Sequence, residues 1–178
     1  MTRQPTNIRQ ARLEDATKLF AVHQRSVQLL CAANYSAEHM ATWFTGRSPD
    51  MYLPAMQAGQ LWVAEANGQI IGFVGAEPGE VTLLFVAPEV AGLSIGSTLF
   101  EFGLMRASEN FQGPVTVVAT RNSVSFYRRF GFNELEELSF VRGEPPLHYP
   151  VVKMVRSPFA PASSLQTEAI RRRAGSGR

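Results

Sequence analysis

The stretch from residue 81 to residue 97 has the residue types and the order that a phosphate site needs. An apolar strand stops at Pro88, a loop of small residues follows, and a helix is expected to begin near Ile95. A helix N-terminus leaves backbone N–H groups without an acceptor, and its dipole favours negative charge. Gly92 and Gly96 let the backbone approach a ligand closely. The same order also occurs in α/β proteins with no ligand there, so this stretch alone is weak evidence.

A second group of residues that could do chemistry lies about thirty residues further along. The β-branched run over 115–119 predicts a strand buried on both faces, and the short helix after it carries Tyr127 and ends at Gly131. A phenol with a pKa near 10 stays protonated at neutral pH and can donate a proton. We interpret the aromatic residues around it as core: Phe126, Phe130 and Phe132.

Together, the two stretches resemble the acyl-CoA-binding half of the GCN5-related N-acetyltransferase superfamily. The resemblance covers about residues 6–156 and includes the order of the elements. It implies an α/β fold: a single domain with a mixed, mostly antiparallel sheet of about seven strands flanked by helices. It also implies that acetyl-CoA is the co-substrate and that the acetyl group passes directly to a primary amine. No metal is implied.

The resemblance assigns the cofactor contacts to the strand end and the loop. In the superfamily this loop usually reads Arg or Gln, two residues, Gly, one residue, then Gly or Ala. Here Ala91 stands at the position of the Arg or Gln, and Ser94 stands at the position of the first Gly. We therefore expect the backbone N–H groups of 93–97 to carry the binding. The implied cofactor-binding residues are Leu84, Phe85, Val86, Ala91, Gly92, Leu93, Ser94, Ile95, Gly96, Ser97 and Asn122.

Two catalytic roles follow from the resemblance. Tyr127 occupies the position of a phenol that protonates the CoA thiolate; the alternative is that it only packs. Glu80 stands eleven residues before Ala91, the offset of the base glutamate in the histone-acetyltransferase branch. It would deprotonate the amine directly or through water, or else be a solvated turn residue. His39 and His148 are lesser candidates for the base.

The acceptor pocket is expected between the first two helices and the last hairpin. The resemblance to a bacterial subgroup of small-substrate acetyltransferases implies four wall residues: Tyr35, Trp43, His148 and Tyr149. The aromatic ones could equally be ordinary packing residues. The acceptor is a small-molecule or peptide amine whose identity this pattern leaves open.

The remaining elements follow from local signals. Asn67-Gly68 between two apolar runs predicts a hairpin. Ser36 is a candidate N-cap for a second helix. The other expected elements are a strand over 8–11, an amphipathic helix from 13 to about 32, a short helix over 51–58 and two strands near 133–142 and 149–155.

Composition limits the class of protein. The 178 residues suit one domain, expected over 1–156, followed by a flexible, Arg-rich tail over 157–178. The net charge of +2 comes from that tail. We therefore expect no nucleic-acid partner, although a tail that contacts a polyanion is the alternative. The N-terminus does not resemble a signal peptide and no run is long enough to span a membrane, so we expect a cytoplasmic protein without membrane contact.

Cys31 is the only cysteine, which excludes an internal disulfide. We expect it to be a buried structural thiol, in the wrong place for a covalent intermediate. Two further possibilities remain open at this point. The protein could pair as a homodimer, and the altered loop leaves a non-catalytic CoA-binding regulatory or interaction module as the alternative function.

Overall fold

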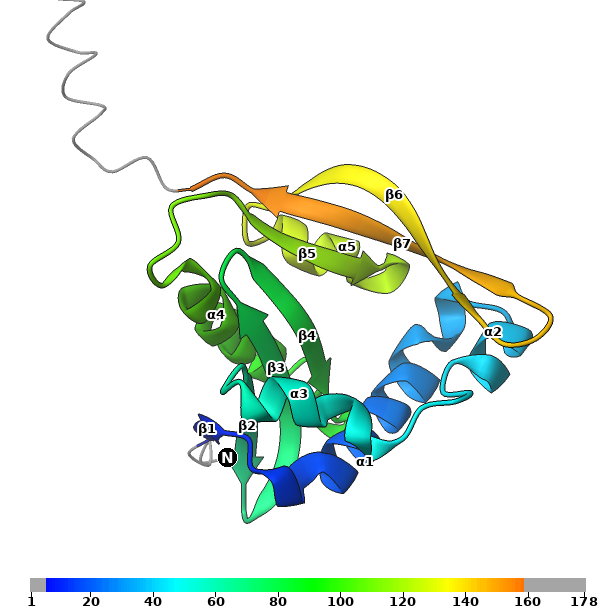
Figure 1. Cartoon of the computed structure of the whole chain (residues 1–178), viewed down its shortest axis with the longest axis horizontal. Helices are drawn as coiled ribbons and strands as arrows, with labels where there is room; N and C mark the ends of the chain where they lie inside the picture. The colour runs from blue at the N-terminus through cyan, green and yellow to red at the C-terminus, as the bar shows by residue number, and fades with distance from the viewer. Residues whose placement is uncertain (1–5, 159–178) are drawn as a thin grey trace, which may run out of the picture.

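The computed structural model describes residues 6–158. Its centre is a seven-stranded sheet in the order β1-β2-β3-β4-β5-β7-β6 (Figure 1). Only β4 and β5 pair in parallel, so the expected mixed, mostly antiparallel sheet is confirmed. The strands are β1 (Asn7–Gln10), β2 (Leu61–Ala66), β3 (Gln69–Glu77), β4 (Glu80–Val86), β5 (Val115–Thr120), β6 (Asn133–Arg142) and β7 (Leu147–Arg156).

Helices cover both faces of the sheet. α1 and α3 pack on one face through a core that includes Leu19, Met56 and Phe73. α4 and α5 pack on the other through Leu99, Phe100 and their neighbours. The helical segments are η1 (Leu13–Asp15), α1 (Ala16–Ser26), η2 (Val27–Cys31), η3 (Ala32–Asn34), α2 (Ala37–Thr42), η4 (Pro49–Tyr52), α3 (Leu53–Gln57), η5 (Pro88–Val90), α4 (Ile95–Ser108), η6 (Arg121–Ser123) and α5 (Val124–Arg128).

Two local predictions are confirmed, a hairpin turn and a helix cap. Asn67 and Gly68 both have positive φ (52° and 72°), which is the conformation of a two-residue hairpin turn. The Ser36 hydroxyl accepts a hydrogen bond from the His39 N–H and caps α2. The first helix differs from the expectation, because its winding changes after Ser26 and η2 is a π-helix.

The decisive feature of the sheet is that β4 and β5 diverge. They pair at only two positions, Glu80 with Thr116 and Val81 with Val117. The pairing of β3 with β4 skips Thr82, which makes a bulge immediately after the last β4–β5 pair. A bulge bends its strand and increases the local twist. The expectation that 115–119 is buried on both faces is therefore wrong, and Val118 is 46% exposed.

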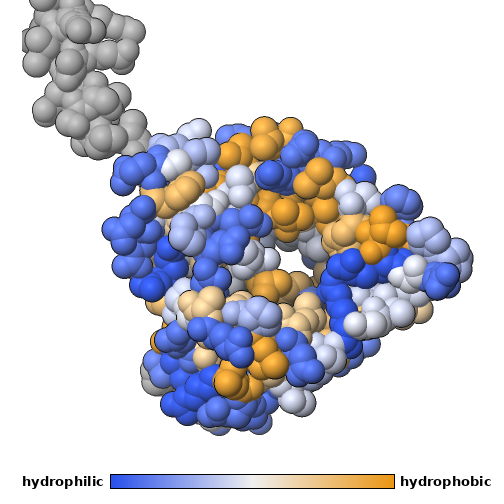
Figure 2. Space-filling view, viewed as in Figure 1, coloured by the Kyte–Doolittle hydropathy of each residue, from blue (hydrophilic) through white to orange (hydrophobic). Residues whose placement is uncertain are grey.

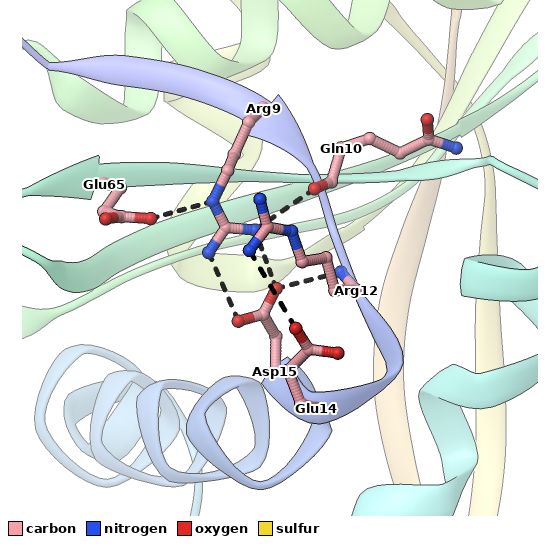
Figure 3. A network of polar contacts seen from close by, with 6 residues as sticks. All are labelled: Arg9, Gln10, Arg12, Glu14, Asp15 and Glu65. Atoms are coloured by element: carbon pink, nitrogen blue, oxygen red, sulfur yellow. Dashed lines mark hydrogen bonds and ion pairs between the residues drawn. The ribbon is translucent and has the colours of Figure 1, made fainter.

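The first strand is fixed to the rest of the fold by an ionic network (Figure 3). The Arg9 guanidinium donates to Glu65 of β2 at 2.8 Å and to both carboxylate oxygens of Asp15 in η1 at 2.8 and 3.2 Å. Asp15 is 2% exposed and also accepts the backbone N–H of Arg12 at 2.9 Å. The buried carboxylate therefore links the edge of the sheet to the start of the first helix.

Two observations concern the limits of the chain. No helix within residues 6–158 is both long enough and apolar enough to cross a membrane. The tail expected over 157–178 falls, from residue 159 onward, outside the described residues.

Candidate active site

The divergence of β4 and β5 opens a cleft of about 270 Å³. Residues 81–86 of β4 form one wall, and Val118 and Thr120 of β5 form part of the other. Residues of α1, η2 and α5 line the remaining sides. Figure 2 shows an opening near the middle of the molecule with apolar side chains around it, where β4, α5 and α1 surround a gap in Figure 1.

The turn before α4 leads into this cleft, because Gly96 in the first turn of α4 lines it. Gly92 and Ser94 both have positive φ (79° and 67°) and turn the chain sharply into the helix. In the described part of the chain, the N–H groups of residues 95–97 have no acceptor. The Leu93 N–H was expected to be free for a ligand, but it already donates to the Val90 carbonyl at 3.1 Å. The expected donor set therefore begins after Leu93.

Tyr127 lines the cleft from α5 and is 7% exposed. Its ring packs edge-on against Phe100 and Phe126, which hold its orientation. Burial raises the pKa of the Tyr127 phenol above its usual value near 10. The hydroxyl is therefore fully protonated at neutral pH and can donate a proton but cannot act as a base.

Glu80 lies just outside the cleft, whose lining begins at Val81. Glu80 pairs with Thr116 of β5, and Thr116 shares a face of the strand with the exposed Val118 two residues later. Glu80 and Thr116 therefore lie on the open side of the sheet. Burial raises the pKa of the Glu80 carboxyl, Glu77 raises it further, and Lys153 lowers it. The position allows contact with the cleft through water.

The wall formed by η2 and η6 is held together by polar contacts. The Asn122 side chain donates to the Leu30 carbonyl at 3.2 Å, and its buried Oδ1 has no partner among the described residues. Cys31 lines the same wall and is 5% exposed. Burial raises the pKa of its thiol to about 11, although Asn122 and Thr120 lower it somewhat. The expectation of a buried thiol is confirmed. Cys31 nevertheless lines the cleft, so its raised pKa and not its place makes it a poor nucleophile at neutral pH.

The expected acceptor-wall residues do not line the cleft. Tyr35, Trp43 and Tyr149 are buried and form a core cluster with Val27 and Cys31. This cluster packs α2 against β7, which agrees with the alternative interpretation of these aromatic residues as packing residues.

Hydrogen bonds also hold the residues around α2 against β7. The Tyr35 hydroxyl donates to the Pro150 carbonyl at 2.9 Å, and the Tyr149 hydroxyl donates to the His39 carbonyl at 2.9 Å. His148 is exposed on β7, where Nδ1 lies 3.2 Å from the Ser139 hydroxyl. The two histidines named as lesser base candidates therefore lie at the hairpin and not in the cleft lining.

The sequence comparison identifies the family to which the elements around this cleft belong. The family model of the acetyltransferase (GNAT) domain matches residues 31–150. The chain belongs to the GNAT acetyltransferase family. The match includes β4, the turn before α4, β5 and α5, which are the elements that form the cleft.

Relatives and solved structures agree with this assignment. The chain is 27% identical over 157 residues to the peptidyl-lysine N-acetyltransferase YjaB of Salmonella typhimurium, covering 84% of this chain and 97% of that protein. It is 26% identical to the uncharacterized N-acetyltransferase YafP of Escherichia coli, covering 69% and 78%.

Two solved structures share the fold. The GCN5-related N-acetyltransferase from Rhodopseudomonas palustris aligns with a TM-score of 0.75 at 22% identity, covering 88% of this chain and 98% of that one. The PaiA N-acetyltransferase from Thermoplasma acidophilum, solved in complex with coenzyme A, aligns with a TM-score of 0.69 at 23% identity, covering 86% and 99%.

Compared with the usual pattern of the GNAT loop, this chain has Ala91 in place of the polar first residue and Ser94 in place of the first Gly. Ser94 takes the left-handed conformation at the position where the family pattern has its first Gly. Sequence reasoning missed several lining residues: Ser26, Leu30, Thr82, Val118, Thr120 and Ser123. No local pattern marks them, because they meet only where β4, β5 and η2 come together. The free N–H groups and the unpartnered Asn122 Oδ1 fit a ligand that carries both phosphate and amide groups.

Proposed function

We propose that this GNAT protein transfers the acetyl group of acetyl-CoA to a primary amine directly, without a covalent enzyme intermediate. The observation that carries the proposal is the continuity of the cleft from the free N–H groups at the start of α4 to Tyr127. An acyl-CoA needs an anion site at one end and a proton donor at its sulfur. Both ends are present along one path.

The cofactor is held by backbone groups in this proposal. The N–H groups of residues 95–97 face the pyrophosphate, together with the dipole of α4. Beyond Val81, the edge of β4 that faces β5 has no strand partner, so the N–H and C=O groups of 84–86 are available to the amides of pantetheine. The Asn122 Oδ1 is a further acceptor for one of these amides.

Tyr127 then acts as the general acid. The amine attacks the thioester carbonyl, the C–S bond breaks, and the Tyr127 hydroxyl donates its proton to the departing sulfur. The phenol regains a proton from solvent after the thiol has left. The raised pKa keeps the phenol protonated at any physiological pH, although it also makes the phenol a weaker acid.

The amine must lose a proton to attack. Glu80 is proposed to take this proton through water, since it lies one residue beyond the lining of the cleft. Its raised pKa brings the carboxylate closer to the value that suits a general base near neutral pH. Cys31 takes no part, because a thiol with a pKa of about 11 is almost entirely protonated at pH 7.

The first experiment is calorimetric titration of the purified protein with acetyl-CoA, followed by acetyl-transfer kinetics with lysine peptides. The peptides are the first acceptors to try, because two relatives carry the name peptidyl-lysine N-acetyltransferase. We expect micromolar binding and initial-rate lines that intersect, as direct transfer requires. Parallel lines would indicate a covalent intermediate, and no binding up to millimolar acetyl-CoA would exclude the proposal.

The role of Tyr127 is tested by Tyr127→Phe. We expect kcat to fall about 100-fold, since general acid catalysis contributes roughly that factor or more. The affinity for acetyl-CoA should change less than threefold, because the ring and its packing remain. Phe132→Leu, a change in the same core, serves as a control for packing effects. An unchanged kcat in Tyr127→Phe would assign the phenol a packing role only.

A further inference from the structure

Two arginine side chains near α2 and the tip of the β6–β7 hairpin have no carboxylate partner within the described residues. Arg47 follows α2, and Arg142 is the last residue of β6. Six other arginines each form an ion pair with a carboxylate: Arg9, Arg12, Arg25, Arg106, Arg121 and Arg128. Arg47 and Arg142 are both partly buried, so they lose water without gaining a counter-charge.

The packing of the hairpin on α2 brings the two segments together. The Arg47 N–H donates to the Phe44 carbonyl at 3.0 Å, and Phe44 packs on the same aromatic cluster as Phe140. The Arg142 guanidinium lies over the Phe140 ring, 4.8 Å from its centre. Gly143 faces Thr42 of α2, since a Cβ there would lie 3.8 Å from that side chain.

The electrostatic environment of Arg47 agrees with this placement. Burial lowers the pKa of Arg47, and the positive charge of Arg142 lowers it further. The groups that raise it are the phenols of Tyr52 and Tyr149, and no carboxylate is among them. The positive charge of Arg142 therefore acts on Arg47, and neither side chain is paired with a carboxylate of the described residues.

Unsatisfied polar atoms gather in the same region. Five buried side-chain nitrogen or oxygen atoms have no partner in the described part of the chain, and three of them lie here: Nε of Arg142, Nε1 of Trp43 and Nε2 of His23. The Trp43 and Phe140 rings are 5.9 Å apart. Nε of Arg142 and Nε1 of Trp43 are N–H donors without an acceptor. Such donors are the complement of an oxygen-rich ligand.

The same region adjoins the cleft through His23. This side chain is 2% exposed, and its Nδ1 lies 2.8 Å from the Tyr52 hydroxyl. Its ring lies tilted against that of Phe85, with the ring centres 3.7 Å apart, and Phe85 lines the cleft. Burial lowers the pKa of His23 to about 3, with Arg47 lowering it further, so the imidazole adds no third charge at neutral pH.

We propose that Arg47 and Arg142 bind a carboxylate of the acceptor, so that the preferred substrates are amines that carry a carboxylate. The inference rests on the proposed function, because it names the substrate class of the same site. Guanidinium groups hold carboxylates through paired N–H···O bonds, which fix the position of the group as well as its charge. The carboxylate could belong to a free amino acid or to an Asp or Glu residue beside a lysine in a peptide.

The experiment compares matched ligands that differ only in this charge. One arm uses L-amino acids and their α-carboxamides, and the other uses lysine peptides flanked by Glu or by Gln. Binding to the CoA-saturated protein is measured by calorimetry, and acetyl transfer is measured in parallel. In the wild type we expect the carboxylate member of at least one arm to bind tenfold or more tightly, and the arm that shows this identifies the source.

Variants assign the preference to the two arginines. In Arg142→Gln and Arg47→Gln the tenfold preference should fall to less than twofold, whereas Arg142→Lys should keep part of it. Arg106→Gln is the matched control, because Arg106 also lies over an aromatic ring and has a buried, unpartnered Nε, but is paired with Glu109. It should keep the full preference.

The outcomes separate the two proposals. Equal binding of both members in both arms by the wild type would overturn the carboxylate site, whatever the activity. A preference that survives in both glutamine variants would overturn it too. A preference for carboxylates without any acetyl transfer would overturn the proposed function and leave the anion site standing.

Discussion

Tyr127 and Cys31 line the same cleft, and burial affects their chemistry in opposite ways. Burial disfavours the charged form of each group and raises both pKa values. The phenol therefore keeps the proton that it would donate, although the higher pKa also makes it a weaker acid. For a nucleophile it is unfavourable, because only the thiolate attacks. The same environment thus supports direct transfer and opposes a covalent intermediate at Cys31.

Glu80 is the residue whose role depends most on water. We expect Glu80→Gln to lower kcat/KM about tenfold at pH 7, with little change in acetyl-CoA affinity, because the amide cannot accept the proton. The measurement is a pH profile of kcat/KM, in which the acidic limb should disappear in the variant. Glu77→Gln is the comparison, since Glu77 is exposed and pairs with Glu80 in the sheet. It should keep the acidic limb and move it to lower pH, because Glu77 raises the pKa of Glu80. If both variants retain the wild-type profile, water alone deprotonates the amine.

In the proposed cofactor site, the turn before α4 offers backbone N–H groups and no charged side chain. Ser94 holds φ = 67°, a conformation that costs an L-residue about 1–2 kcal/mol and costs Gly nothing. Gly96 of the first helical turn lines the cleft, so the N–H groups of this turn begin at its edge. A left-handed conformation that Gly adopts readily is thus present at Ser94 although the residue is not Gly.

Replacing Ser94 tests whether its backbone conformation is strained. We expect Ser94→Gly to raise the free energy of unfolding by about 0.5–1 kcal/mol, because relief of strain exceeds the extra unfolded-state entropy of Gly. Urea unfolding without ligand measures the difference. Ser97→Gly, in the first turn of α4, should have the opposite sign, since Gly is a poor helix former. A loss of stability in both variants would show that Ser94 is not strained.

The molecule as a whole depends on contacts that close the sheet at its first strand. Burial alone would raise the pKa of Asp15, but hydrogen bonds from Arg9 and from the Arg12 backbone lower it below 3.8. The unfolded chain therefore takes up this proton first as the pH falls. The stabilisation is complete above about pH 5 and is lost as the pH falls through 4 and below.

This predicts a pH-dependent effect of Asp15→Asn. At pH 7 the variant should lose about 1–3 kcal/mol of unfolding free energy, since a buried charge-assisted network is broken. The difference from the wild type should shrink at pH 3, where the wild-type carboxylate also begins to take up its proton. Glu14→Gln is the control, because Glu14 is exposed and lies 3.9 Å from Arg12. A difference that stays constant from pH 7 to pH 3 would contradict the linkage.

Local patterns in the sequence determined the element order, the Asn67-Gly68 hairpin, the turn before α4 and the helix that carries Tyr127. Each of these depends on neighbouring residues, so periodicity, turn chemistry and the resemblance to the family were enough. The tertiary structure alone decided which side chains face the cleft. Thr82 bulges and β4 leaves β5, so Val118 is exposed and Cys31 faces the cleft.

Around α2 and the β6–β7 hairpin, the residue types were likewise visible in the sequence and their surroundings were not. The sequence marked Tyr35, Trp43 and Tyr149 as aromatic residues, but their burial follows from the packing of α2 on β7, which no short pattern encodes. Arg47 and Arg142 are unremarkable in the sequence, and the segments that carry them come close only because the hairpin packs on α2, where Gly143 lies against Thr42. Exposure and charge pairing depend on segments far apart in the chain, so they were decided when those segments packed together.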